Sequence, residues 1–402
     1  MRLENLIKQY GAPKILIDHH NDLNQGHAIW KYEDSLIFNT SGLIRNNKHI
    51  QESPLLALNK AIEDWSRDSD FISSVGYVSY SMREHLFPHI NFKKKKQTMP
   101  YFWFIKPDKI LTYDIDSFNN VELKNILSIK EDLFPIKKYT QKIKAIKQHL
   151  YDGDVYQINF TMQKILNNDI DPFYLYLMIR QIAKPKFGYF INTGESYILS
   201  FSPENFFKIS DGMIKTYPMK GTRSRNSDDN IDQKLKKELE QSSKDKAEHL
   251  MIVDLMRNDL GKICEYGTIN VANLFKVNSY ETVHQMVSCI SGELNNNIQY
   301  SDILQALFPG GSITGAPKES AMKIIDEIEN YNRELYTGMI GYITNKGNMN
   351  FNIAIRTMCI QNNIIKYSVG GGIVWDSNAK EELAEAQLKS KILDNIIRES
   401  SS

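Results

Sequence analysis

The order of the expected elements predicts an α+β protein built on antiparallel sheet. Four strand patterns follow one another over residues 187–216, two helix patterns follow over residues 229–258, and more strand patterns come at residues 268–293 and 336–374. Strands and helices thus occur in runs and do not alternate strictly, which argues against a parallel α/β barrel. The composition, with 42% hydrophobic and 24% charged residues in a chain of 402, is typical of a globular protein with a large core.

The sequence pattern of the chain changes near residue 136. Before it, residues 53–66 predict a helix, and the alternation over Val75–Tyr80 predicts a strand. After it, a Lys-rich amphipathic helix is expected over residues 136–150, followed by a strand over Val155–Thr161. The residues whose side chains could take part in catalysis or ligand binding lie after residue 136.

Charge and hydropathy exclude several classes of function. The chain has 49 basic and 48 acidic residues, so no overall field favours nucleic acid or an anionic membrane. The basic run Lys93–Lys96 has no interleaved aromatic or Arg residue and is expected to be a solvated loop. No stretch approaches the ~18 consecutive apolar residues of a membrane span, and residues 1–14 lack the apolar run of a signal peptide. Three widely spaced cysteines, Cys264, Cys289 and Cys359, are expected to be reduced thiols in a cytoplasmic protein.

A carboxylate and an amine lie sixteen residues apart, each close to a proline. Glu204 follows Pro203, and Lys220 comes two residues after Pro218 in the segment Tyr-Pro-Met-Lys-Gly-Thr. A carboxylic acid and a lysine can act as general acid and nucleophile on the same small molecule. The pair alone is a weak indication, and its weight comes from the motifs that follow it in the chain.

Two helix patterns each place two carboxylates one turn apart. Asp245 and Glu248 are i and i+3 in the first helix, and Glu382 and Glu385 are i and i+3 in the second, with Lys389 four residues after Glu385. Oxygen ligands of this kind suit Mg²⁺. A solvated, salt-bridged helix face is the competing interpretation, and it is stronger for the second helix, which is charged throughout. The first helix is apolar almost all round and is expected to be buried, so Glu248 needs a partner there.

Three further segments suit an anionic ligand. The loop Phe308–Lys318 is expected to open a helix at Pro317, whose free amides favour an anion, but it lacks the Gly-Lys-Ser/Thr ending of a phosphate-binding loop. The run Gly370–Gly372 allows close backbone approach and lacks the dinucleotide fingerprint. Arg356 lies in a strand expected over residues 349–360, where an Arg usually pairs with a carboxylate of the protein or of a ligand. Together, these segments fit a dianionic substrate.

Nine blocks of the sequence, taken in order, resemble the chorismate-utilising enzymes, which include anthranilate synthase, aminodeoxychorismate synthase and isochorismate synthase. The blocks lie within residues 136–393 and are GDVYQINFT, SFSPENFF, TYPMKGTRSR, AEHLMIVDLMRNDLG, TVHQMVS, FPGGSITGAPK, YTGMIGYI, FNIAIRT and VGGGIVWDSNAKEELAEAQLKSK. Residues 1–135, with GYVSYS, are similar to the variable N-terminal half of the same family, so we expect one unit whose chorismate-binding catalytic region is residues 136–402. The resemblance implies an anthranilate-synthase-like α+β fold, with two lobes of antiparallel sheet flanked by helices and a site between the lobes.

The resemblance also implies chorismate as the substrate, Mg²⁺ as the cofactor and a set of site residues. Glu248 and Glu385 match the Mg²⁺ ligands, with Glu382 and Asp245 in support. The residues that match the substrate pocket are Arg356 and the amides of Gly371 and Gly372, which hold carboxylates, and Tyr336, Thr314 and Gly315, which form the wall.

Lys220 indicates which reaction to expect. Family members that make anthranilate or isochorismate carry Ala at the matching position, whereas aminodeoxychorismate synthases carry Lys. An Ala leaves C2 of chorismate open to ammonia or water. A lysine amine, kept neutral by burial or by Mg²⁺, can instead attack C2 and expel the C4 hydroxyl, which Glu204 would protonate. Ammonia would then add at C4 and release the lysine, giving 4-amino-4-deoxychorismate for folate synthesis.

Two other positions bear on this assignment. Isochorismate-forming relatives tend to carry a Lys base at the position of Gln157, and Gln cannot activate water in that way. Anthranilate synthases carry a His where this chain has Gln285, and the neighbouring His284 faces the other side of the strand, so we assign no catalytic His.

The expected reaction needs ammonia, and no cysteine lies in the Gly-x-Cys-x-Gly elbow of a glutaminase. We therefore expect a separate glutamine amidotransferase subunit as the partner. Two alternatives stay open: the large component of anthranilate synthase, in which Lys220 would be a bystander, and a non-catalytic chorismate-binding homologue. The second has no need for an acid, a nucleophile and a metal site together, and chorismate binding without dependence on Mg²⁺ would favour it.

Overall fold

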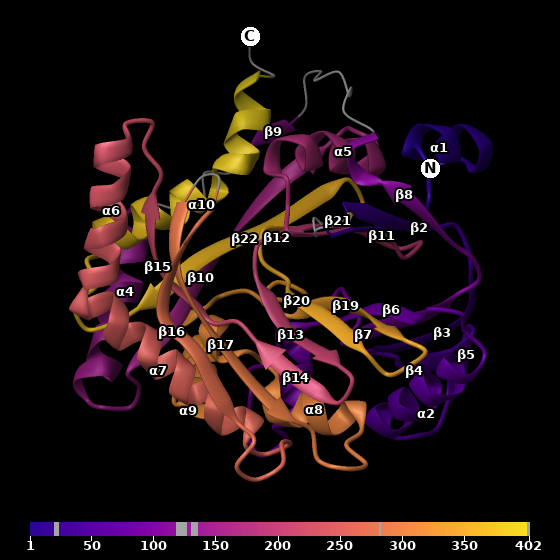
Figure 1. The fold of residues 1–402 in the computed structure, drawn as a ribbon, viewed down its shortest axis with the longest axis horizontal. Helices are drawn as coiled ribbons and strands as arrows, with labels where there is room; N and C mark the ends of the chain where they lie inside the picture. The colour runs from indigo at the N-terminus through magenta and orange to yellow at the C-terminus, as the bar shows by residue number, and fades with distance from the viewer. Residues whose placement is uncertain (20–23, 118–126, 130–135, 281–282, 400–402) are drawn as a thin grey trace.

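The computed structural model of the chain describes residues 1–19, 24–117, 127–129, 136–280 and 283–399. Two antiparallel sheets pack face to face, and helices cover the outer face of each (Figure 1). The predicted α+β fold with two lobes of antiparallel sheet is confirmed. Among the described helices, none combines the length and the hydropathy needed to cross a lipid bilayer.

The first sheet has ten strands, and the strands at one of its edges carry some of the predicted site residues. Its strand order is β18 (Gly315–Ala316), β10 (Gln157–Asn168), β22 (Ile364–Ile373), β21 (Thr357–Gln361), β12 (Tyr197–Ser202), β11 (Phe187–Asn192), β1 (Ile15–Asp18), β2 (Gln25–Ile29) and β8 (Ile110–Asp114), with β9 (Leu127–Ile129) paired to the far end of β10. The long pair of β10 and β22 is in register from Ile158 opposite Ile373 to Asn167 opposite Ile364.

The second sheet has twelve strands. Its order is β15 (Met219–Ser224), β17 (Val283–Glu293), β14 (Met213–Thr216), β13 (Asn205–Ser210), β20 (Met349–Ile353), β19 (Met339–Thr344), β6 (Ile72–Val78), β7 (Phe102–Pro107), β3 (Tyr32–Asn39), β4 (Gly42–Arg45) and β5 (Lys48–Ile50), with β16 (Asn270–Ser279) paired to β17. Strands from the first 135 residues extend both sheets, because β1 pairs with β11 and β6 pairs with β19.

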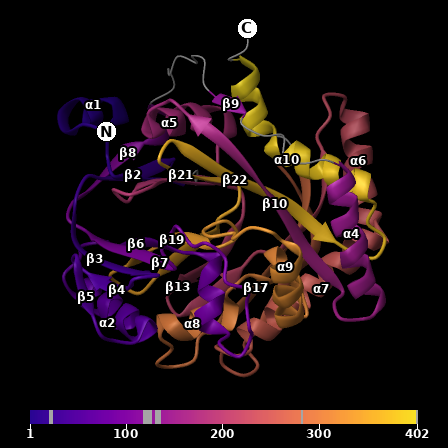
Figure 2. The same ribbon diagram turned by 180° about the vertical axis from the view of Figure 1, so that it is seen from behind.

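Ten helices are described, and most of them form the two outer layers. They are α1 (Leu3–Tyr10), α2 (Pro54–Arg67), α3 (Arg83–Leu86), α4 (Ile136–Tyr151), α5 (Pro172–Ala183), α6 (Asp229–Gln241), α7 (Ser243–Leu260), α8 (Tyr300–Leu307), α9 (Lys318–Ile328) and α10 (Ala379–Glu399). Helices α4, α5, α9 and α10 pack on the first sheet, and α2, α7 and α8 pack on the second. Seen from behind, α4 and α9 lie beside β10 (Figure 2).

A third apolar cluster fills the space between the two sheets. Side chains alternate along the strands, so that Tyr189 and Ile191 of β11 face this inner cluster while Phe190 faces the helices outside. From the second sheet, Val75 and Tyr77 of β6 point into the same cluster. The sheets are therefore held together by a continuous apolar layer, which fixes the segments that cross between them.

Two sequence expectations about single elements are wrong. The strand expected over residues 349–360 is two strands, β20 and β21, which belong to different sheets. The helix α7 is not buried all round, because it packs on the second sheet by one face and leaves Leu250 41% exposed. An apolar side chain on a helix therefore does not by itself place that face in the core.

The basic run at Lys93–Lys96 is more than a solvated loop. The amine of Lys95 lies 3.0 Å from a carboxylate oxygen of Asp326, and the backbone N–H of Lys93 donates to the other oxygen at 2.6 Å. Asp326 is 3% exposed. The run is thus tied to the end of α9, a contact between residues more than 230 positions apart.

Candidate active site

The chain crosses from one sheet to the other at two neighbouring places, and each crossing carries a predicted site residue. Glu204 lies between β12 of the first sheet and β13 of the second, and Arg356 lies between β20 and β21. The two crossings are hydrogen-bonded side by side, because the N–H of Ile353 donates to the carbonyl of Glu204 at 3.1 Å and the N–H of Phe201 donates to that of Arg356 at 3.0 Å. A side chain at a crossing is thus held between two rigid sheets.

Lys220 comes from the edge of the second sheet. It lies in β15 opposite Met286 of β17, and the pairing is irregular between Lys220 and Thr222. Gly221 makes this bulge with a φ of 67°. A methyl group on Gly221 would lie 2.9 Å from Asp245 Oδ1, so the bulge packs tightly against α7 and requires glycine.

The Lys220 amine meets two predicted site residues of the first sheet. A methyl group built on Gly372 of β22 would lie 3.0 Å from Lys220 Nζ and 3.1 Å from Gln157 Nε2. Gln157 is fully buried, and neither its amide nitrogen nor its oxygen has a hydrogen-bond partner within the described part of the chain. A buried carboxamide without partners is costly unless a ligand satisfies it. The amine and the carboxamide therefore both lie close to Gly372, where a polar ligand would satisfy the carboxamide.

This geometry predicts opposite outcomes for two neighbouring glycines. Gly372→Ala would press a methyl against the Lys220 amine and the Gln157 carboxamide, and we expect the catalytic efficiency to fall about 10- to 100-fold. Gly371→Ala should cost much less, because its methyl would lie 3.6 Å or more from its neighbours on the α10 side. Neither glycine has a positive φ, so backbone strain does not separate the two variants. Steady-state kinetics with chorismate check the prediction, and equal losses would contradict it.

Burial shifts the pKa values of Glu204 and Lys220 in the directions that favour their uncharged forms. Burial raises the pKa of Glu204 to about 7, although a hydrogen bond from Ser312 and the charges of Lys220 and Lys389 lower it. The Ser312 hydroxyl donates to Glu204 Oε1 at 3.1 Å. Burial lowers the pKa of Lys220, and Lys389 adds to this effect, while the negative charge of Glu248 acts against it. Burial therefore favours the protonated form of the Glu204 carboxyl and the neutral form of the Lys220 amine.

Two of the predicted metal ligands, Glu382 and Glu385, lie beside the same glycine run. A methyl on Gly371 would lie 3.7 Å from Glu382 Oε2 and 4.0 Å from Glu385 Oε1. Burial and the charge of Glu382 raise the pKa of Glu248, whereas Lys389, which pairs with Glu385 at 2.7 Å, lowers the pKa of Glu385 against its burial. Within the described ranges, no three His, Cys, Asp or Glu side chains are grouped closely enough to hold a metal ion.

The carboxylate of Asp245 points elsewhere. Its Oδ2 accepts a hydrogen bond from the guanidinium of Arg223 at 2.9 Å, and its other oxygen packs against Gly221. Asp245 therefore holds the bulge beside Lys220 in this structure, and its support of a metal stays a prediction.

The loop before α9 forms a closely packed wall. Thr314 is fully buried, and Gly315 has a φ of 142° and pairs with Ile158 of β10. A methyl on Gly315 would lie 2.1 Å from the carbonyl oxygen of Gln157, so only glycine allows this contact. Tyr336 is 8% exposed, and its backbone N–H donates to the carbonyl of Arg333. The wall residues of the loop are thus fixed against the strand that carries Gln157.

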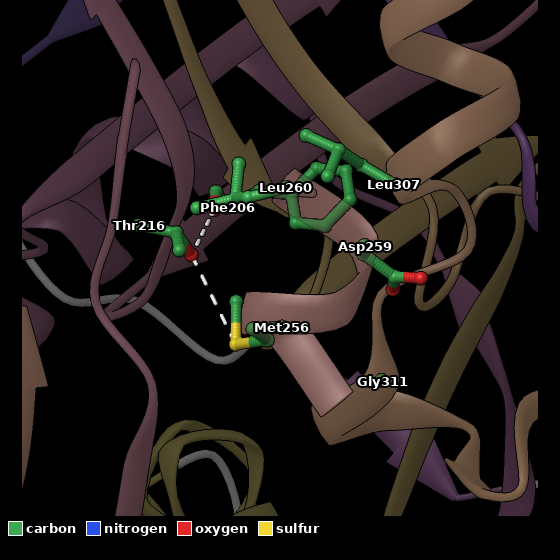
Figure 3. A pocket seen from close by; sticks show the side chains of 7 residues that line it. All are labelled: Phe206, Thr216, Met256, Asp259, Leu260, Leu307 and Gly311. Carbon is green, nitrogen blue, oxygen red and sulfur yellow. Dashed lines mark hydrogen bonds between the residues drawn. The ribbon is translucent and has the colours of Figure 1, made fainter. Parts of the chain in front are cut away.

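The loop is backed by α7 on its other side. A cavity of about 10 Å³ separates them, which is room for about one water molecule (Figure 3). Thr216 donates to the carbonyl of Phe206 at 2.9 Å on one side of this cavity, and Met256 lies beside it. A methyl on Gly311 would lie 2.4 Å from Leu255 Cδ2. At Gly311 the loop therefore packs directly against α7.

Arg356 is not the buried strand residue that the sequence predicted. It is exposed, and its φ of 49° is left-handed, because the chain turns there from one sheet into the other. No described carboxylate lies within ion-pair distance of its guanidinium. The interpretation as a partner of an internal Asp or Glu is therefore wrong for the described residues, and a role toward a ligand carboxylate stays a prediction.

Two groups that the sequence interpretation passed over belong to this site. Ser312 donates to Glu204, and Lys389 both pairs with Glu385 and donates to the carbonyl of Gly370 at 3.0 Å. Lys389 was visible only as a helix partner of Glu385, four residues away. The polar loop of Ser312 gave no sign that it would face a carboxylate 108 residues earlier in the chain.

The histidine beside the site is engaged elsewhere. His284 contacts Asp232 through Nε2 at 3.0 Å and Ser279 through Nδ1 at 2.9 Å. Gln285 lies opposite Thr222 of β15. These contacts tie His284 to α6 and β16, and the expectation of no catalytic His stays a prediction.

A family model described as chorismate binding enzyme matches residues 13–394. The chain belongs to the chorismate binding enzyme family. It is 34% identical over 336 residues to anthranilate synthase component 1 of Saccharolobus solfataricus, a match that covers 80% of each chain. It is 42% identical over 249 residues to aminodeoxychorismate synthase component 1 of Escherichia coli, which covers 62% of this chain and 55% of that protein. The corresponding protein of Bacillus subtilis is 36% identical over 252 residues, covering 63% of this chain and 54% of that protein.

Matches to these aminodeoxychorismate synthase components thus span about half the length of those relatives. Two solved structures share the fold of this chain. Anthranilate synthase component I from Streptococcus pneumoniae aligns with a TM-score of 0.80 at 24% identity, covering 93% of this chain and 92% of that chain. A putative 2,3-dihydroxybenzoate-specific isochorismate synthase from Bacillus anthracis aligns with a TM-score of 0.75 at 21% identity, covering 98% of each chain.

Proposed function

We propose that this chain is the chorismate-aminating component of an aminodeoxychorismate synthase. It would convert chorismate and ammonia to 4-amino-4-deoxychorismate for folate synthesis in the cytoplasm. One observation carries the proposal: the Lys220 amine, whose pKa burial lowers, lies at the same point as the unpartnered Gln157 carboxamide and the bare face of Gly372. The 42% identity to an aminodeoxychorismate synthase component supports it.

The residues account for a balanced pair of substitutions. The neutral Lys220 amine forms a bond to C2 of chorismate, both double bonds of the ring diene shift, and the C4 hydroxyl leaves as water with a proton from Glu204. Ammonia then forms a bond to C4, both double bonds shift back, and the C2–N bond breaks to release Lys220 as the neutral amine. Glu204 recovers its proton from the ammonium group formed at C4, and no oxidant or reductant is required.

Gln157 would orient the substrate beside the amine. Its carboxamide presents one donor face and one acceptor, and both are free among the described residues. The backbone amides of Gly371 and Gly372 and the exposed guanidinium of Arg356 would bind the two carboxylates of chorismate. Thr314, Gly315 and Tyr336 would close the pocket as a rigid wall.

The carboxylates around Gly371 fit Mg²⁺ in their chemistry. Glu248 and Glu385 would be ligands, with Glu382 beside them, and all three offer oxygen atoms of the kind that Mg²⁺ prefers. Burial raises the pKa of Glu248 and of Glu382, and a nearby dication would favour their charged forms. Bound Mg²⁺ would neutralise a substrate carboxylate in the site.

We expect activity to depend on Mg²⁺ through these two helices. Chelation with EDTA should abolish amination, and added Mg²⁺ should restore it. Glu248→Gln and Glu385→Gln should each raise the Mg²⁺ concentration for half-maximal activity at least about 10-fold. Asp254→Asn on the exposed side of α7 is the matched control and should leave it unchanged, since Asp254 pairs with Arg257 at 3.1 Å. Full activity in EDTA would contradict the assignment.

Ammonia would come from a separate glutamine amidotransferase subunit. The curated relatives in Escherichia coli and Bacillus subtilis carry the name component 1, which is consistent with a two-component enzyme. An ammonium salt should substitute for the partner, because the site needs ammonia itself and not glutamine.

Product analysis tests the proposed function. Purified protein is incubated with chorismate, Mg²⁺ and an ammonium salt, and the products are separated by chromatography. The proposal expects a product that an added lyase converts to 4-aminobenzoate. Anthranilate as the product would instead establish the anthranilate synthase assignment, which the 34% identity over 80% of the chain favours as the second candidate. Chorismate binding without turnover would indicate a non-catalytic homologue.

A further inference from the structure

A buried arginine outside the predicted site ties the two segments of the pocket wall together. Arg333 is 3% exposed and lies between α9 and β19. Its Nη1 donates to the carbonyl of Ile313 at 2.9 Å, and its Nη2 donates to the carbonyl of Asn159 at 2.6 Å. Ile313 directly precedes Thr314 of the loop, and Asn159 is two residues after Gln157 in β10. One planar group thus spans the loop and the strand.

A carboxylate and an aromatic ring hold the guanidinium of Arg333 in place. Glu329 accepts from Arg333 Nε at 2.8 Å and from Nη2 at 2.7 Å, so the pair is bidentate. The same carboxylate accepts from the N–H and the hydroxyl of Thr161 in β10, at 2.9 and 2.8 Å. The ring of Tyr80 covers the guanidinium, with a distance of 4.7 Å from the ring centre to Cζ.

We infer that Arg333 is a positioning residue, which fixes the loop of Thr314 against the strand of Gln157 and so sets the shape of the chorismate pocket. The inference rests on the proposed function, since it takes these two segments to line the substrate site. It goes beyond that function, because Arg333 touches none of the reacting groups and carries no part of the chemistry. The fork geometry is essential to the role, since three acceptors in different directions must be served at once.

A second buried arginine provides a matched control. Arg83 is 3% exposed, pairs with Asp326 at 2.8 Å and lies 4.6 Å from the centre of the same Tyr80 ring. Its other ring contact in the described part of the chain is Phe92, and its carboxylate partner lies at the end of α9 away from the loop. Arg83 therefore shares the burial, the ion pair and the aromatic contact of Arg333, and it lacks the two hydrogen bonds to the pocket wall.

The test compares Arg333→Lys with Arg83→Lys. A lysine keeps the positive charge beside the buried carboxylate in each case, but it cannot donate to Glu329, Ile313 and Asn159 together. We expect Arg333→Lys to weaken chorismate binding, measured by calorimetry with Mg²⁺ present, at least about 10-fold. The KM should rise by more than kcat falls. Arg83→Lys should lower Tm and leave both the affinity and the KM within about 2-fold of the wild-type values.

If Arg333→Lys does not fold, Glu329→Asp decides the matter. The shorter carboxylate keeps its charge and draws the guanidinium away from the two carbonyls, so the affinity should still fall at least about 3-fold. Folded Arg333→Lys or Glu329→Asp protein with wild-type affinity for chorismate would overturn the inference, as would an equal loss in Arg83→Lys. Because chorismate affinity is independent of which product forms, failure here is distinct from failure of the proposed function.

Discussion

Replacing Lys220 with Ala should reduce the formation of 4-amino-4-deoxychorismate by roughly 10³-fold or more, because the variant lacks the nucleophile that opens C4 to ammonia. The rate is measured with an ammonium salt, so that the partner subunit does not enter the result. Lys220→Arg should fail to nearly the same extent. It keeps a positive charge near Glu248, but a guanidinium remains protonated and is no nucleophile.

A surface lysine on a neighbouring strand serves as the control for these variants. Lys215 lies in β14 with its side chain exposed, and Lys215→Ala should retain wild-type activity. Amination that survives in Lys220→Ala would mean that ammonia attacks chorismate directly. Lys220 would then be the bystander that the anthranilate synthase interpretation requires.

Glu204→Gln should lower kcat by about 10²- to 10⁴-fold, the range expected for loss of a general acid. In the wild-type protein the acid form is needed, and its pKa is about 7, so kcat/KM should fall as the pH rises through that value. Glutamine cannot ionise, so the variant should lose this limb of the pH profile. A profile with the same alkaline limb in both proteins would assign the titration to another group.

The same substitution should stabilise the protein at high pH. Burial raises the folded-state pKa of Glu204 from 4.5 to about 7, so its favourable contribution is complete below the unfolded pKa and disappears as the pH rises through 7. Above pH 7 the buried carboxylate costs about 2 to 3 kcal/mol, with allowance for the solvent that still reaches it. Glu204→Gln should therefore gain stability relative to wild type between pH 4 and pH 8 in denaturant titrations. A constant difference across that range would contradict the burial of the charge.

Much of the fold follows from local pattern. The helix expected at residues 53–66 is α2, and the one at 136–150 is α4, because amphipathic spacing and a proline at the first turn are local properties. The helix α5 was not anticipated, although Asp171 caps it by accepting from the N–H of Tyr174 at 2.9 Å and Pro172 begins it. Its nearly continuous apolar sequence hid the helical period.

The predictions that failed concern features of the tertiary structure, which bring together segments far apart in the sequence. Arg356 looks like part of a strand because apolar residues flank it, yet the chain leaves one sheet and enters the other there. Lys95 looks solvated because its neighbours are lysines, yet it reaches a buried aspartate on α9. Nothing within a few residues of Arg356 or Lys95 in the sequence indicates the sheet crossing or the distant carboxylate.

The candidate site likewise contains residues that the sequence could identify and residues that it could not. Motif matching identified Glu204, Lys220 and Gln157. The structure brings Lys220 and Gln157 to the same glycine, Gly372, and places Glu204 at a crossing between the two sheets. Motif matching could not identify Ser312 or Arg333, whose importance lies in the atoms that they contact across the fold. A residue proposed to act on a ligand can be recognised from its residue type. A residue that positions others can be recognised only from the atoms that it contacts in the folded structure.

Intact-protein mass spectrometry tests the covalent role of Lys220 most directly. The protein is incubated with chorismate and Mg²⁺ but without ammonia, so that the second substitution cannot discharge an adduct. We predict a mass gain equal to chorismate less one water, located on Lys220 by peptide mapping and absent from Lys220→Ala. A chain that gains no mass, yet makes 4-amino-4-deoxychorismate once ammonium is added, would contradict the account.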